Sequence, residues 1–168
     1  MVTTVTNYIT EMLERLAAME KEALTDAGYL CDAKPFFFWQ QEAFPYFTNR
    51  LGADDPTGIT EGYQQDMEQE IYTVRVRLVI AHITQDVPGE SEGLLYDYIP
   101  LVNNFIRNHP WLQSTAFPTG MDILDPIGVS IESNTGLMIF NNAGFKSNQV
   151  GCEWALRVPF IIPIEQEY

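Results

Sequence analysis

Few residues in this chain of 168 have types and spacings suited to catalysis. It holds two histidines, His82 and His109, and two cysteines, Cys31 and Cys152, and none of them belongs to a metal-ligand or redox spacing. The sequence contains no GxSxG turn, no GxxxxGK phosphate loop, no GxGxxG segment and no HExxH. We therefore predict no catalytic site, no metal site and no cofactor, and expect a protein that is not an enzyme. Both thiols are expected to be reduced and packed.

Charged residues give the more informative pattern. Arg75 and Arg77 alternate within 71–83, so they share one face of a predicted strand. The stretch 51–70 has six acids and no Lys or Arg, which predicts a long acidic surface loop. Its acids do not follow the calcium-loop spacing of an EF-hand. We expect contacts with another copy or a partner from these residues: Arg75, Arg77, Asp54, Asp55, Glu61, Asp66 and Glu68. For the arginines, inter-subunit ion pairs and a simply solvated face remain alternatives.

The composition limits the class of protein. Apolar residues make up 46% and charged residues 19%, which indicates one folded domain over residues 1–168. Nine Lys and Arg against 23 Asp and Glu give a net charge of 9 − 23 = −14, which argues against sequence-independent binding of nucleic acid or of anionic membranes. No run approaches the roughly 20 apolar residues of a membrane span, and no export signal is apparent, so a soluble protein is expected.

Two amphipathic helices are predicted. The first covers 3–27, ends at Gly28, and has a solvated face that includes Glu20. The second is traced by apolar residues from 94 to 108, with Ser91 as the expected N-cap, and Pro100 is expected to kink or break it. His109 follows its end and is expected to interact with the helix dipole.

Several strands complete the prediction. Aromatic-rich short strands are expected in 36–39 and 44–47, belonging to the core or to an interface. Long strands are expected over 71–83 and 149–162, with shorter ones over 127–132 and 137–140. In the last strand Glu153 and Arg157 share the polar face, and antiparallel pairing of the long strands would bring Arg75 or Arg77 near Glu153. We therefore predict an α+β single domain, with two helices packed on one face of a mostly antiparallel sheet and a long acidic loop.

This order of segments resembles the tail terminator, or tail completion, proteins of long-tailed bacteriophages. The segments that carry the resemblance are FFFWQQEAFPYFTNR, IYTVRVRLVIAHI, GLLYDYIPLVNNFIRNHPWL and GCEWALRVPFIIP. The resemblance implies a ring, commonly of six copies, that caps the tail tube, ends its polymerisation and joins it to the head connector. It also implies assembly in the host cytoplasm, a final place in the neck of the virion, and a lumen that DNA crosses without specific binding. The family has no catalytic or cofactor residues to carry over.

Other functions fit the same sequence. A tail tube subunit or a head–tail joining protein is the nearest alternative. A small cytosolic ligand-binding or enzymatic α+β domain, with the acidic segment as a lid or cation site, is the alternative from another class. A third alternative is an acidic inhibitor that mimics DNA.

Overall fold

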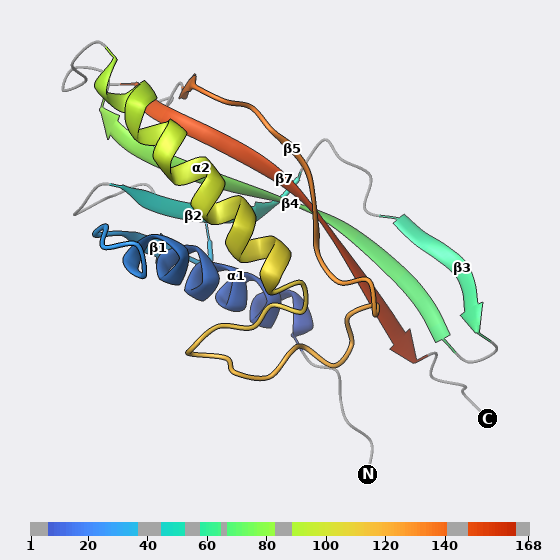
Figure 1. Cartoon of the computed structure of the whole chain (residues 1–168). Coiled ribbons are helices and arrows are strands. Elements are labelled where there is room, and N and C mark those ends of the chain that lie inside the picture. The colour runs from blue at the N-terminus through green and yellow to red at the C-terminus, as the bar shows by residue number, and fades with distance from the viewer. Residues whose placement is uncertain are drawn as a thin grey trace.

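Two helices cover one face of a seven-stranded sheet (Figure 1). The computed structural model describes residues 7–36, 45–52, 58–64, 67–82, 89–140 and 148–163, with the backbone alone for 58–64 and His82. The helices are α1 (Tyr8–Thr25) and α2 (Glu90–Asn108). The strands are β1 (Asp32–Lys34), β2 (Tyr46–Leu51), β3 (Gly58–Gln64), β4 (Met67–His82), β5 (Ser130–Asn134), β6 (Met138–Phe140) and β7 (Gln149–Pro163). The predicted α+β class is confirmed.

The sheet is built around the two long strands β4 and β7, which pair antiparallel along their whole length. The order is β1-β2-β4-β7-β5, with β3 beside the first part of β4 and β6 beside the first part of β7. The β1–β2 pair is parallel and the other pairs are antiparallel. β1 and the β5–β6 segment therefore form the two opposite edges of the sheet.

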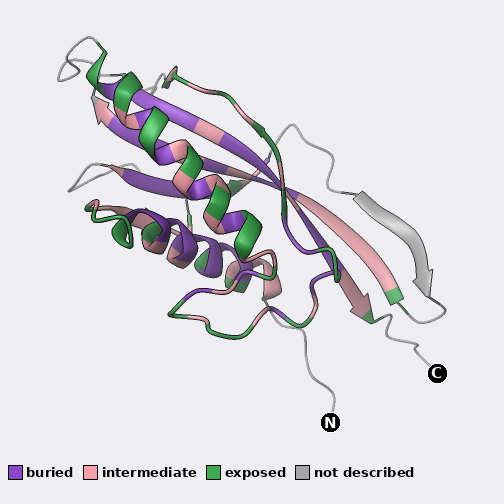
Figure 2. Cartoon of the chain, in the orientation of Figure 1, coloured by how far each residue is buried: buried purple, intermediate pink, exposed green. Residues whose placement is uncertain are grey.

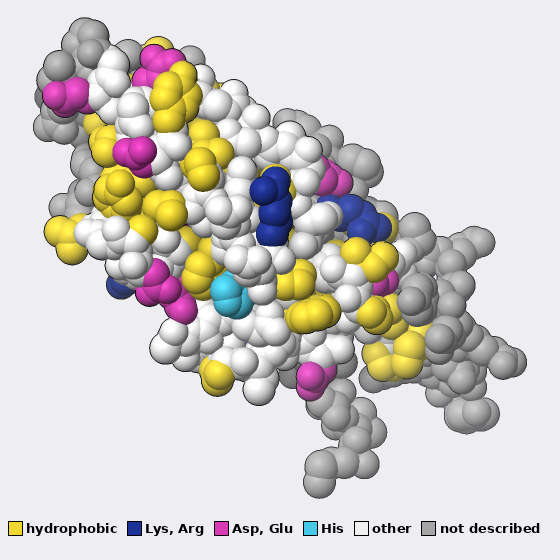
Figure 3. Space-filling view, in the orientation of Figure 1, with side chains coloured by type: hydrophobic (Ala, Val, Ile, Leu, Met, Phe, Trp, Pro, Cys, Tyr) yellow, Lys and Arg dark blue, Asp and Glu magenta, His cyan; other side chains and the backbone are white. Residues whose placement is uncertain are grey.

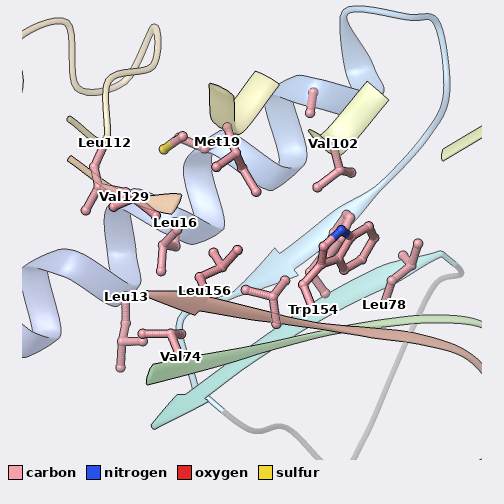
Figure 4. Close-up of a cluster of buried hydrophobic side chains, with 14 of the residues drawn as sticks. Leu13, Leu16, Met19, Val74, Leu78, Val102, Leu112, Val129, Trp154 and Leu156 are labelled. Carbon is pink, nitrogen blue, oxygen red and sulfur yellow. The ribbon is translucent and has the colours of Figure 1, made fainter. Parts of the chain in front are cut away.

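The main core lies between the helices and the sheet (Figure 4). Leu13, Leu16 and Met19 of α1 meet alternate residues of β4 and β7, among them Val74, Leu78, Trp154 and Leu156. Trp154 is fully buried, and its indole Nε1 donates a hydrogen bond to Asn103 Oδ1 of α2 at 2.8 Å. This bond satisfies the polar atom of the largest core side chain, as burial of an indole requires. Figure 2 shows that both helices bury one stripe and expose the other.

The helices differ from their predictions at the ends. α1 begins at Tyr8, not at residue 3, with Asn7 at its N-cap in a left-handed conformation, and Gly28 at its end has φ +89°, as predicted. α2 begins one residue before Ser91, which is buried inside the helix, so the expected N-cap is wrong and Gly89 occupies that position. Pro100 does not end α2. Because proline has no N–H, the Tyr96 carbonyl lacks its helical hydrogen bond. Pro100 and Tyr96 are both exposed, so this carbonyl lies on the solvent side of the helix.

The predicted loop at 51–70 is wrong. β2 ends at Leu51, and 58–64 form β3, which makes a hairpin with the start of β4. The strand expected at 71–83 therefore begins four residues earlier, at Met67. The aromatic strand expected at 44–47 corresponds to β2, whereas 37–44, and with them most of the strand expected at 36–39, lie outside the described residues.

The β3–β4 hairpin extends past the helices. In Figure 1, β3 and the adjoining ends of β4 and β7 lie beyond both helices. The side chains from Met67 to Tyr72 are all intermediate or exposed, whereas Val74, Val76 and Leu78 of the same strand are fully buried. This end of the sheet thus projects from the body of the molecule.

Candidate interaction surfaces

Four arginines gather on the sheet face that the helices leave uncovered. The even-numbered residues Val74, Val76 and Leu78 of β4 face the helices, so Arg75 and Arg77 face the other way. Register places Arg50 of β2 opposite Arg75, and Arg157 of β7 opposite Thr73. These four, of the nine Lys and Arg in the chain, are called the arginine face below.

Glu153 is the only acid on this face of β2, β4 and β7 among the described side chains. It lies opposite Arg77, with Arg77 Nε 3.2 Å from Glu153 Oε2, which confirms the predicted proximity. The Arg77 guanidinium also lies 4.0 Å from the centre of the Phe140 ring. Arg77 thus forms an ion pair within its own chain.

Arg50 is the exposed member of the face, and Arg157 is partly exposed. The Arg50 side chain is 49% exposed, and its Nη2 is 4.0 Å from the Glu153 carboxylate. Arg157 is partly exposed and has no acid within ion-pair distance in the described part of the chain. Neither residue is among the predicted contact residues, although the alternation of Tyr46, Thr48 and Arg50 within β2 is a usable signal for Arg50.

Of the acids proposed as contact residues, only Glu68 has a described side chain, and it does not lie on the arginine face. Glu68 lies on β4, on the face that carries Glu70 and Tyr72, and precedes Arg75 by seven residues. Glu61 belongs to β3, where only the backbone is described. Asp54, Asp55 and Asp66 lie outside the described residues.

Both edges of the sheet expose large hydrophobic side chains. Leu30 and Phe36, which flank the edge strand β1, are 88% and 53% exposed. Leu137 and Ile139, at β6 on the opposite edge, are 49% and 51% exposed. They make up four of the eight large hydrophobic side chains exposed in the described residues. We call the first pair the β1 edge and the second pair the β6 edge. On the side of the molecule that carries the helices, Figure 3 shows hydrophobic side chains in several separate groups.

A buried polar pair was missed by the sequence analysis. Glu20, expected on the solvated face of its helix, is 2% exposed, so that prediction is wrong. Its Oε2 accepts a hydrogen bond from Asn49 Nδ2 at 3.0 Å, and the same amide donates to the Lys34 carbonyl at 3.1 Å. The pair links α1 to β2 and β1, and burial raises the pKa of Glu20 well above its usual value.

A second polar group fixes the start of α1 on the sheet. The Tyr8 hydroxyl donates to Glu70 Oε2, and the Tyr72 hydroxyl donates to the same oxygen at 2.7 Å. Burial, together with these bonds to Glu70, raises the pKa of Tyr8, and burial is also the main cause of the raised pKa of Tyr72. The Glu70 carboxylate is therefore already bound by two hydroxyl groups.

The remaining thiol and imidazole side chains that the structure describes are those of Cys31, Cys152 and His109. Cys31 and Cys152 are free, as predicted, and burial raises the pKa of each thiol to about 12. His109 Nδ1 lies 2.9 Å from the Phe105 carbonyl at the end of α2, and the ring stacks on Phe105. No group of three or more His, Cys, Asp or Glu among the described residues could hold a metal ion. Neither helix combines the length and apolar character needed to cross a membrane.

The sequence matches no protein-family model, and no curated protein is significantly similar to it.

Proposed function

We propose that this chain is a structural protein of a bacteriophage tail, a terminator that assembles into a closed ring on the end of the tail tube. The observation that carries the proposal is the presence of apolar residues at both edges of one sheet, at Leu30 and Phe36 on one side and Leu137 and Ile139 on the other. Apolar groups of this size at strand edges favour contact with another chain.

The two edges differ, so contact between them is heterologous. The β1 edge of one copy meets the β6 edge of the next, which leaves one free edge of each kind on the growing assembly. Such contacts close into a ring when the rotation between neighbours is a whole fraction of a turn, and otherwise form open filaments. A ring matches the terminator function, in which assembly stops, and the tail tube and head connector are the expected partners on its two sides. The proposed function involves no enzymatic activity. The ring would assemble in the host cytoplasm and then become part of the neck of the virion.

Native mass spectrometry and negative-stain imaging across a concentration series test this proposal directly. Closed rings of one size support the terminator. Open cylinders of variable length would replace it with a tail tube subunit. A monomer at every concentration, also in the presence of the ends of tail tubes, would reject self-assembly.

A further inference from the structure

Positive charge is concentrated on one surface of a strongly acidic chain. Among the described side chains of β2, β4 and β7 on the arginine face, four arginines and Glu153 give a net charge of 4 − 1 = +3. The whole chain carries −14, so the remainder carries −14 − 3 = −17. Another copy of the chain is therefore a strongly complementary partner for this face.

The projecting hairpin has the opposite charge. Residues 58–70 contain four acids and no Lys or Arg. Glu70 is bound by Tyr8 and Tyr72, whereas Glu68 is partly exposed at the start of β4. Glu61 lies on β3, the strand that pairs with this end of β4.

Within one chain, Glu68 and the arginine face cannot meet. Glu68 precedes Arg75 by seven residues, which is about 23 Å along a strand at roughly 3.3 Å per residue. The two side chains also leave β4 on opposite faces, because their positions differ by an odd number of residues. On the face itself, the Arg50 side chain is 49% exposed and Arg157 is partly exposed.

We propose that the arginine face is a docking surface for the acidic β3–β4 hairpin of another copy of this chain. The inference rests on the proposed self-assembly and identifies a second contact within it. Like the contact between the edges, it joins two different surfaces and is therefore heterologous. Because it depends on partly exposed ion pairs, it weakens as salt rises above about 0.15 M, whereas the apolar edge contact does not.

Mixing two variants that each carry one introduced surface cysteine tests the contact. One carries Glu68→Cys and the other Arg157→Cys, both with Cys31→Ser, while the fully buried Cys152 stays in place. Under mild oxidation we expect a disulfide between the two chains. The control mixture replaces Glu68→Cys with Glu14→Cys, an exposed position of α1, and should give no disulfide. An equal yield from both mixtures, or none from either, would overturn the proposal.

Charge exchange provides the second test. R50E/R157E changes the face from +3 to −1, E61K/E68K changes residues 58–70 from −4 to 0, and each should increase dissociation of the assembly at least tenfold at low salt. The variant with all four changes again has opposite charges at the exchanged positions, and should dissociate less than either double variant. Matched controls change the same amount of charge at exposed positions elsewhere, with K21E/R107E for the face and E14K/D26K for the hairpin. Failure of the fourfold variant to recover, with an unchanged thermal unfolding transition, would overturn the proposal.

The outcomes separate this contact from ring formation. If the wild type forms rings but the cysteine variants give no specific 68–157 disulfide, the hairpin contact is rejected and the ring is retained. The specific disulfide without rings, at high protein concentration, would support the contact and reject the ring. DNA retention that R50E/R157E abolishes, with no disulfide, would reject the hairpin as occupant and assign the face to nucleic acid.

Discussion

Arg77 and Glu153 are 76 residues apart in the sequence and lie directly opposite each other on β4 and β7, joined by a 3.2 Å ion pair. Their side chains are only 17% and 11% exposed. The pair favours the observed register of the two longest strands at the centre of the arginine face, since shifting one strand by one residue would turn its charged side chain toward the core.

Replacing Glu153 alone should destabilise the fold. Glu153→Ala leaves the mostly buried Arg77 guanidinium without this partner, and we expect a loss of about 2 kcal/mol in the free energy of unfolding. The double variant R77M/E153M removes both charges together and should lie within about 1 kcal/mol of the wild type. Urea unfolding of both variants and of R77M measures the coupling. Additive losses would show that the ion pair contributes nothing of its own.

Glu20 predicts a pH dependence of stability. Burial raises its pKa in the folded state above the ordinary value of 4.5, so the folded chain retains a proton that the unfolded chain has lost. Its contribution is fully present below about pH 4.5 and decreases as the pH rises toward the folded pKa. Glu20→Gln keeps an oxygen that accepts from Asn49 and carries no charge, so its advantage over the wild type should grow with pH.

Thermal unfolding between pH 4.5 and 8 measures this difference. The control is Glu14→Gln, an exposed position on the same helix, which should follow the wild-type curve. A constant difference between Glu20→Gln and the wild type at every pH would contradict the explanation.

Gly151 is required by close contact between β7 and β4. A Cβ atom at this position would lie 1.9 Å from the Leu78 carbonyl oxygen, which is backbone and cannot rotate away. We expect Gly151→Ala to cost about 3 kcal/mol, at the upper end of what overpacking usually costs. Gly93→Ala in α2 is the matched control: it meets no atom within 4 Å, and should stabilise the protein by about 0.5–1 kcal/mol. Chemical denaturation of the two variants compares them, and similar stabilities would refute the contact.

The sequence predicts the long strands better than the features that surround them. Alternation over a dozen residues determines both faces of β4 and β7, so the proximity of Arg77 and Glu153 follows from pairing them. β3 has two glycines in GITEGYQ and no regular alternation, and it is a strand because β4 lies beside it. Acidic side chains on helices are usually solvated, so the burial of Glu20 depends on Asn49, which is 29 residues away.

The surface residues likewise include some that the sequence predicts and others that depend on the whole fold. Alternation identifies Arg75 and Arg77, but the exposure of Leu30 and Ile139 depends on which strands lie at the edges, and strand order is a property of the whole sheet. Hydrophobic residues in a single sequence are assigned to the core by default. The exposed apolar edges could therefore not be predicted without the strand order of the fold.

The heterologous nature of the edge contact predicts a distinctive result on mixing. Leu30→Glu places a charge on the β1 edge, and Ile139→Glu places one on the β6 edge; both positions are exposed, so folding should be unaffected. Each variant alone should remain monomeric. Mixed in equal amounts, they should form a one-to-one dimer and nothing larger, because only the intact β6 edge of the first and the intact β1 edge of the second can meet. Ile127→Glu, 76% exposed and outside both edges, should assemble like the wild type. Native mass spectrometry distinguishes these species, and an absence of dimers in the mixture, with rings in the wild type, would exclude contact between the two edges.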